Sequence, residues 1–300
     1  MIPIAWSAVY AHPLPYSHRF PMQKYALLPD QLLREGIAGK DDFFVPKPMC
    51  EADILRVHQP QYWQRLSQLQ LTGREQRITG FPHTPELIMR ERIIMQGTLE
   101  CALYALRYGA ALNIAGGTHH AYSDRGEGFC LLNDLALATA ALLDNGLIQR
   151  ALIVDLDVHQ GNGTAAIFKD ESRVFTFSMH ASGNYPLRKE QSDLDVGLPH
   201  GTSDREYIAL LSMHLPVLLD AIKPDIVFYQ SGVDVLREDK LGKLHLSHEA
   251  CALRDRLVFR ECSLRALPIV AVMGGGYAEK LSVILNAHAA TFRAARDYYA

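Results

Sequence analysis

The chain has 300 residues, of which 48% are hydrophobic and 21% are charged, as is usual for a globular protein. Its 30 basic and 33 acidic side chains give a formal net charge of −3, which argues against a nucleic-acid-binding or anionic-membrane-binding protein. The five cysteines are widely spaced and form no CxxC pair, so we expect a reducing, cytoplasmic location without a disulfide framework. We expect neither a secretion signal nor a membrane-spanning segment, because no apolar run has the required length or flanks.

Short apolar runs alternate with longer helical patterns along the chain, without a repeat or a linker. In chain order, the sequence predicts a helix at 85–108, a strand at 112–115, a helix from Asn133 or Asp134 to about 144, strands at 151–154 and 174–177, a long surface loop at 181–201, a helix at 202–222, a strand at 225–229, a helix at 247–266 and a strand at 268–272. The predicted strands lack polar alternation, as strands buried on both faces do. We therefore expect a single domain, 1–300, with a doubly wound, mostly parallel α/β sheet and helices on both faces.

Reactive residues follow four of the predicted strands, at the point where each strand ends. The strands lead into four segments: 116–120 with His119 and His120, 155–163 with Asp157 and His159, 231–234 with Asp234, and 274–277 with Tyr277. Ligands of open parallel sheets gather beyond the carboxyl ends of the strands. The pattern therefore predicts one site at this edge of the sheet.

The segment Asp155-x-Asp157-x-His159 is the first candidate for metal binding. Extended backbone would start its three side chains on one face, and carboxylate oxygen and imidazole nitrogen are zinc ligands. Asp157 and His159, joined by Asp234, would make a three-ligand site that keeps a position open for water. The alternative is a polar strand end whose carboxylates cap neighbouring loops.

The histidine pair and the tyrosine complete the candidate site. Hydrolysis of an amide needs a base for water and an acid for the leaving amine, and His119 or His120 could supply both near neutral pH. Tyr277 could donate a hydrogen bond to a developing oxyanion. The alternatives are a structural histidine pair and a tyrosine packed under a glycine turn.

Taken together, these motifs resemble the zinc-dependent histone deacetylases of the arginase/deacetylase fold. The resemblance runs in order from about residue 55 to about residue 277, and segments 123–130 and 234–242 are similar to the class IV branch and its bacterial relatives. The motifs are Gly-Gly-Thr-His119-His120, Gly128-Phe129-Cys130-x-x-Asn133-Asp134, Asp155-Leu-Asp157-Val-His159-Gln-Gly-Asn162-Gly, Ser231-Gly-x-Asp234 and Gly-Gly-Gly-Tyr277.

The resemblance implies a role for each matching residue. Asp157, His159 and Asp234 would bind Zn²⁺, or Fe²⁺ in its place. His120 would be the general base and acid, with His119 beside it, Asp155 orienting His119 and Tyr277 polarising the substrate carbonyl. Water would attack directly, so that Cys130 is not expected to act as a nucleophile.

The resemblance also implies a substrate tunnel and a second ion. Gly128, Phe129, Tyr185 and Gly275 would line a narrow tunnel for the acylated side chain. A structural K⁺ would lie near Asp155, Asp157, His159, Ser178 and Met179, while His180 is interpreted as structural.

Two positions depart from the family pattern. Asn162 stands where class I members have an aspartate beside the catalytic base, so a different pH profile is expected. Segment 80–85 has no acid where many members grip the substrate backbone with an aspartate, and His83 is no clear replacement.

The leading hypothesis is an amidohydrolase acting on acyl-lysine in peptides or proteins, with an acetyl or longer acyl group. The alternatives are an acetylpolyamine amidohydrolase, a non-catalytic acyl-lysine-binding module on the same fold, and a two-metal hydrolase of the related arginase-like fold. We expect neither nucleic acid nor a membrane as a partner.

Overall fold

Eight strands form one parallel sheet in the computed structural model, which describes residues 2–16 and 18–299. Their order across the sheet is β2-β1-β3-β8-β7-β4-β5-β6, and every neighbouring pair is parallel. The strands are β1 (Ile4–Ala5), β2 (Phe43–Phe44), β3 (Ala110–Asn113), β4 (Ala151–Asp155), β5 (Val174–Ala181), β6 (Leu194–Leu198), β7 (Ile226–Gln230) and β8 (Ile269–Val272). The expected parallel α/β sheet is confirmed.

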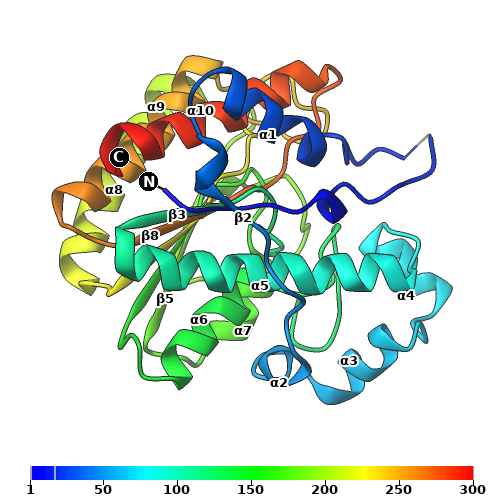
Figure 1. Cartoon of the computed structure of the whole chain (residues 1–300). Helices are drawn as coiled ribbons and strands as arrows, with labels where there is room; N and C mark the ends of the chain where they lie inside the picture. Colours follow the sequence, from blue (N-terminus) through cyan, green and yellow to red (C-terminus); the bar gives the residue numbers. More distant parts are fainter. Residues whose placement is uncertain (1, 17, 300) are drawn as a thin grey trace.

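Helices cover both faces of this sheet (Figure 1). One face carries α5, α6 and α7, and the other carries α1, α8, α9 and α10. The helices are α1 (Lys24–Arg34), α2 (Glu51–Ile54), α3 (Pro60–Ser67), α4 (Gly73–Thr79), α5 (Pro85–Tyr108), α6 (Asp134–Asp144), α7 (Asn162–Phe168), α8 (Asp204–Ile222), α9 (His248–Leu264) and α10 (Leu281–Tyr299), with short 3₁₀ turns η1 (Ala8–Tyr10) and η2 (Lys40–Asp42). No helix in the described ranges combines the length and apolar character needed to cross a bilayer.

Capping residues explain where the predicted helices begin and end. Helix α5 has the predicted bounds, because the Thr84 side chain accepts the Leu87 N–H at its start and Gly109, at φ 91°, ends it. Asn133 caps α6 in the same way. The helices predicted from 202 and 247 begin later, because Ser203 and Ser247 are their N-caps and lie outside the helices.

Two predictions about strands are corrected. The strand predicted at 112–115 is β3, two residues earlier, because it pairs with β8 directly after Gly109 and its buried Asn113 donates to the Ile94 carbonyl. The segment predicted as a loop at 181–201 contains β6, which pairs with the end of β5. Its Asp195 and Gly197 are exposed on an edge strand, so the segment lacked the continuous apolar run of a buried strand.

The central strands end at a common level, and this alignment positions the site. Asp155 at the end of β4 is in register with Gln230 of β7, which in turn is in register with Val272 of β8. All three strands are fully buried. The residues that follow them therefore emerge side by side at one edge of the sheet.

Candidate active site

The carboxylate and imidazole donors after β4 and β7 converge at this edge. His159 Nδ1 lies 3.0 Å from Asp157 Oδ1 and 3.1 Å from Asp234 Oδ2. One ligand atom from each of these three buried residues can be chosen so that all lie within 4.8 Å of one another. The structure thus brings together the three residues predicted as metal ligands.

The local backbone achieves this convergence in a different way from the one expected. Strand β4 ends at Asp155, so Asp157 and His159 do not share a pleated strand with it. Instead, Asp155 Oδ1 accepts the Asp157 N–H at 3.2 Å, and Asp157 Oδ1 accepts the His159 N–H at 3.0 Å. These successive side-chain-to-backbone bonds form a turn that directs both ligands inward.

The second oxygens of the carboxylates are oriented by backbone N–H groups. Asp157 Oδ2 accepts from Gly275 N at 2.7 Å, and Asp234 Oδ1 accepts from Val158 N at 3.0 Å. A side chain at Gly275 would place its Cβ against Asp234 Oδ2, so a glycine is required there. Gly275, predicted as a tunnel residue, lines the pocket and also packs against the ligands.

The donor set fits a divalent cation. Asp234 Oδ2 is buried and, apart from the ion-pair contact with His159 Nδ1 at 3.1 Å, has no hydrogen-bond partner among residues 2–16 and 18–299. Burial and the adjacent Asp157 carboxylate raise the pKa of Asp234 to about 7. Two buried carboxylates this close repel each other, and a cation between them would relieve the repulsion. Asp157, His159 and Asp234 could hold such an ion and leave further positions open, as catalytic zinc sites do.

The two histidines lie beside this cluster, each with its own oriented partner. His119 Nδ1 is 2.7 Å from Asp155 Oδ2, and His120 Nδ1 is 2.6 Å from Asn162 Oδ1. The imidazole centroids are 4.1 Å apart. Because the Asn162 oxygen accepts a hydrogen bond from Nδ1–H, the Nε2 atom of His120 is left as the proton acceptor.

The two imidazoles differ in proton affinity. Burial lowers the pKa of His119, but the carboxylates of Asp155 and Asp157 outweigh it and raise the pKa to about 8. Burial, reinforced by His119 and His159, holds the pKa of His120 well below its ordinary value. His120 is therefore the neutral member of the pair, as a general base must be.

Tyr277 follows β8 and faces the cluster across the pocket. Its backbone N–H donates to Asp239 Oδ2 at 2.6 Å, which fixes the end of the glycine turn. Burial and the carboxylates of Asp234 and Asp157 raise the pKa of its phenol well above the ordinary range. The phenol thus keeps its proton and can donate it in a hydrogen bond.

Of the predicted tunnel residues, Gly128, Phe129 and Gly275 line the same pocket as His120 and Tyr277. Gly128, Phe129 and Tyr185 line its mouth, and the Tyr185 ring stands perpendicular to His120 with centroids 5.0 Å apart. A Cβ at Gly128 would come within 2.7 Å of the His120 ring, so this wall must be a glycine. Cys130 also lines the pocket, but burial raises its thiol pKa well above normal, which disfavours the thiolate.

The residues predicted around a monovalent ion come from the end of β4, the turn that follows it, and the adjacent part of β5. Asp155 of β4 is in register with Ser178 of β5, and Met179 follows. The Ser178 hydroxyl is 2.9 Å from His180 Nδ1, and burial lowers the pKa of His180 to about 4. A neutral, buried His180 agrees with its structural interpretation, while the ion itself stays a prediction.

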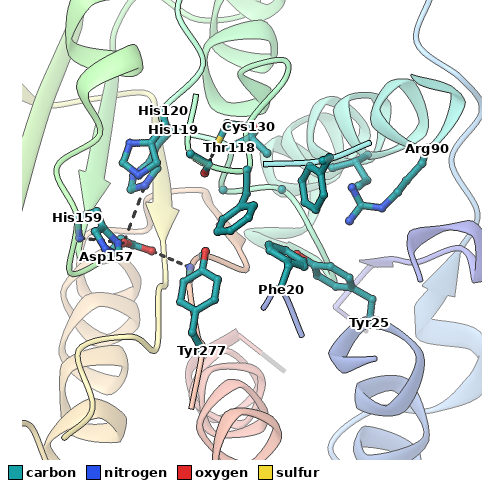
Figure 2. A pocket seen from close by; sticks show the side chains of 18 residues that line it. Phe20, Tyr25, Arg90, Thr118, His119, His120, Cys130, Asp157, His159 and Tyr277 are labelled. Carbon is teal, nitrogen blue, oxygen red and sulfur yellow. Dashed lines mark hydrogen bonds and ion pairs between the residues drawn. The ribbon is translucent and has the colours of Figure 1, made fainter. Parts of the chain in front are cut away.

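Sequence reasoning missed the inner end of the pocket. Figure 2 shows Phe20, Tyr25 and Arg90 across the pocket from the histidines. They come from the segment before α1, from α1 and from α5, none of which carries a recognisable motif. Lys24 is also buried here and donates to the Gly274 carbonyl at 3.1 Å. Lys24 and Arg90 are charged residues on the buried, otherwise apolar faces of their helices. A charge at such a position is the one sequence signal that could have pointed to them.

The two departures from the family pattern can be located. Asn162 is the partner of His120, as expected. His83 is bound to Thr79 Oγ1 at 2.9 Å and does not line the mouth of the pocket.

Comparison with known proteins identifies the same family as the motifs. Residues 18–292 match the histone deacetylase domain family. The chain is 45% identical over 297 residues to an uncharacterised protein of Picosynechococcus sp., covering 99% of both chains. It is 30% identical over 269 residues to histone deacetylase 2 of Arabidopsis thaliana, covering 87% of this chain and 70% of the relative.

A solved structure shares the fold. The crystal structure of a histone deacetylase homologue from Aquifex aeolicus superposes with a TM-score of 0.83, at 23% identity, over 97% of this chain and 82% of the homologue. The matches establish the family, whereas the likeness to the class IV branch stays a prediction.

Proposed function

The chain belongs to the histone deacetylase family, and from this premise and the geometry of its pocket we propose that it hydrolyses the acyl amide of acyl-lysine in peptides or proteins. The observation that carries the proposal is the convergence of Asp157, His159 and Asp234 beside a neutral His120. Membership of the family makes the chain a deacetylase; the metal, the residue roles and the acyl-lysine substrate are our proposal.

The residues of the strand-end edge divide the chemistry. Asp157, His159 and Asp234 would hold Zn²⁺, or Fe²⁺, which polarises a carbonyl and activates water when bound. His120 Nε2 takes the proton of the attacking water and returns it to the leaving amine nitrogen. The C–N bond breaks, and a carboxylate and a free amine leave.

His119 and Tyr277 support this proton transfer from either side. His119, held by Asp155 at 2.7 Å, places a positive charge next to the developing negative charge. The Tyr277 phenol donates a hydrogen bond to the oxygen of the scissile carbonyl. Asn162 orients His120 through its amide oxygen without adding a negative charge, so the protonated His120 is less stabilised than beside an aspartate.

The mouth of the pocket favours acyl-lysine over an acylated polyamine. Its charged lining residues are Arg19 and Lys243; both are exposed, and neither forms an ion pair within the described ranges. The nearby carboxylate of Glu127 already accepts hydrogen bonds from Arg125 and from the Tyr185 hydroxyl. A polyamine keeps further protonated amines that these two cations would repel.

We also propose a structural K⁺ near Asp155 and Ser178, and a cytoplasmic location. The first is supported by the register of Asp155, at the end of β4, with Ser178 within β5. The second is supported by five free cysteines, four of them buried.

The test is a panel of acetyl-lysine and longer acyl-lysine peptides and acetylpolyamines, each assayed with Zn²⁺ and with Fe²⁺. We expect metal-dependent turnover of acyl-lysine, faster with acidic than with basic flanking residues, and little turnover of polyamines. His120→Ala is the matched inactive control. Preferential turnover of polyamines would overturn the substrate assignment, and equal turnover by His120→Ala would favour a non-catalytic binding module.

A further inference from the structure

Glu127 stands at the mouth of the pocket between two structures that the proposed reaction uses. The Tyr185 hydroxyl donates to Glu127 Oε2 at 2.7 Å. The Asn162 amide reaches the same oxygen at 3.5 Å. Glu127 Oε1 accepts from Arg125 Nε at 2.7 Å. One carboxylate thus contacts both the aromatic wall of the pocket and the partner of His120.

The backbone of Glu127 is held in place. Its N–H donates to the Cys130 carbonyl at 3.0 Å, and its carbonyl accepts the Cys130 N–H at 2.8 Å. The left-handed residues Gly128 and Phe129 lie between these two bonds. The Glu127 side chain, only 18% exposed, therefore projects from a closed turn that also forms the opposite wall of the pocket.

Tyr185, by contrast, comes from the long segment between β5 and β6. Its residue is 40% exposed, yet its ring stands against His120 and approaches the position of a Gly128 Cβ to 3.3 Å. Packing covers only part of this ring, so its hydroxyl bond to Glu127 supplies the remaining constraint. A hydrogen bond to a charged group constrains more strongly than one between neutral groups.

We propose that Glu127 is a positioning residue that latches the Tyr185 wall across the mouth of the pocket and thereby sets the width available to the acyl chain. Through its longer contact with Asn162, it also supports the pair that orients His120. The inference rests on the proposed function for its effect on catalysis, but the latch itself can be measured without any substrate.

The first experiment measures hydrogen–deuterium exchange in the full-length, zinc-loaded protein without substrate. Breaking the bond with Tyr185→Phe or Glu127→Ala should speed exchange about tenfold in peptides covering residues 183–188. Asp124→Asn is the matched control, because it removes a charge from the same loop at a residue that contacts Arg125 and not Tyr185. This control should leave exchange in 183–188 unchanged.

The second experiment is a kinetic cycle on the acyl-lysine substrate of the panel. Tyr185→Phe should raise KM about 3- to 10-fold and leave kcat within about twofold, because the wall is loosened while His120 keeps its partner. Glu127→Ala should raise KM similarly and also lower kcat. The double variant should have the same KM and kcat as Glu127→Ala alone, since both single changes break the hydrogen bond between Tyr185 and Glu127.

Glu127→Gln provides the conservative rescue. Its amide oxygen can still accept from Tyr185, so KM should stay within about twofold of wild type. It also keeps the test usable if Glu127→Ala fails to fold.

The latch is overturned if Tyr185→Phe changes neither exchange nor KM, or if the effects of the two single variants add fully in the double variant. If no member of the acyl panel is turned over, the proposed function fails, and the exchange experiment still decides whether the latch exists.

Discussion

The two sides of the pocket are built in different ways. The reactive side consists of residues that follow β3, β4, β7 and β8, whose ends are in register. The opposite side is lined by Phe20 and Tyr25 near α1 and Arg90 on α5, with Lys24 buried behind them against the rings of Phe20, Tyr25 and Tyr277. Strand ends therefore supply the residues of the proposed chemistry, while helices bring supporting groups to the pocket.

Removal of the general base from the strand-end side should have the largest effect. His120→Ala should lower kcat about 10²- to 10⁴-fold, because the other two imidazoles that line the pocket among the described residues, His119 and His159, have raised pKa values and are held by carboxylates. The bound metal should be retained, since His120 is not among its three proposed ligands. Single-turnover rates together with metal analysis measure both quantities. A decrease in kcat of less than tenfold would contradict the claim that the strand-end side supplies the chemistry.

His58, buried against the N-cap residue of α6, should make stability depend on pH. It is buried, accepts the backbone N–H of Asn133 at 3.0 Å, and burial lowers its pKa to about 4. The unfolded chain takes up this proton near pH 6.5 and the native protein does not, so stability should fall as the pH drops from about 6.5 to about 4. The contribution over this window is about 3 kcal/mol.

Chemical denaturation of wild type and His58→Gln across this pH range checks this expectation. The free energy of unfolding of the variant should fall less steeply with decreasing pH, because the contribution of His58 is missing. Parallel pH curves for the two proteins would contradict the assignment.

On the helix side, Lys24 should support the reaction without binding the metal. It donates to the Gly274 carbonyl, and its charge lies among the rings of Phe20, Tyr25 and Tyr277. Lys24→Met should lower kcat about 10- to 100-fold through misplacement of Tyr277. Metal affinity should be equal or higher, because a cation near Asp157 and Asp234 has been removed.

Lys24→Arg, which keeps the charge and a donor, is the matched control and should stay within about threefold of wild type. If Lys24→Met lowers metal affinity and leaves kcat unchanged, Lys24 supports the metal site and the proposed division of roles between the two sides is wrong.

The same division explains what the sequence could predict. Asp157, His159, Asp234 and Tyr277 could be assigned because each follows an apolar run that ends in a recognisable motif. Phe20, Tyr25 and Arg90 could not, because their place in the pocket depends on how α1 and α5 pack against the sheet. The edge strand β6 could not be predicted either, because its exposed Asp195 and Gly197 are typical of a loop. The bond from Tyr185 to Glu127 joins two loops whose relative position no local pattern fixes.

The most direct test of the account is the metal stoichiometry of the purified full-length chain and of Asp234→Ala, measured by zinc titration calorimetry and elemental analysis. Wild type should bind about one zinc ion per chain, and Asp234→Ala should lose most of its affinity because a buried charged ligand is missing. Equal zinc binding by the two proteins would contradict the three-ligand centre, and two ions per chain would favour the arginase-like alternative.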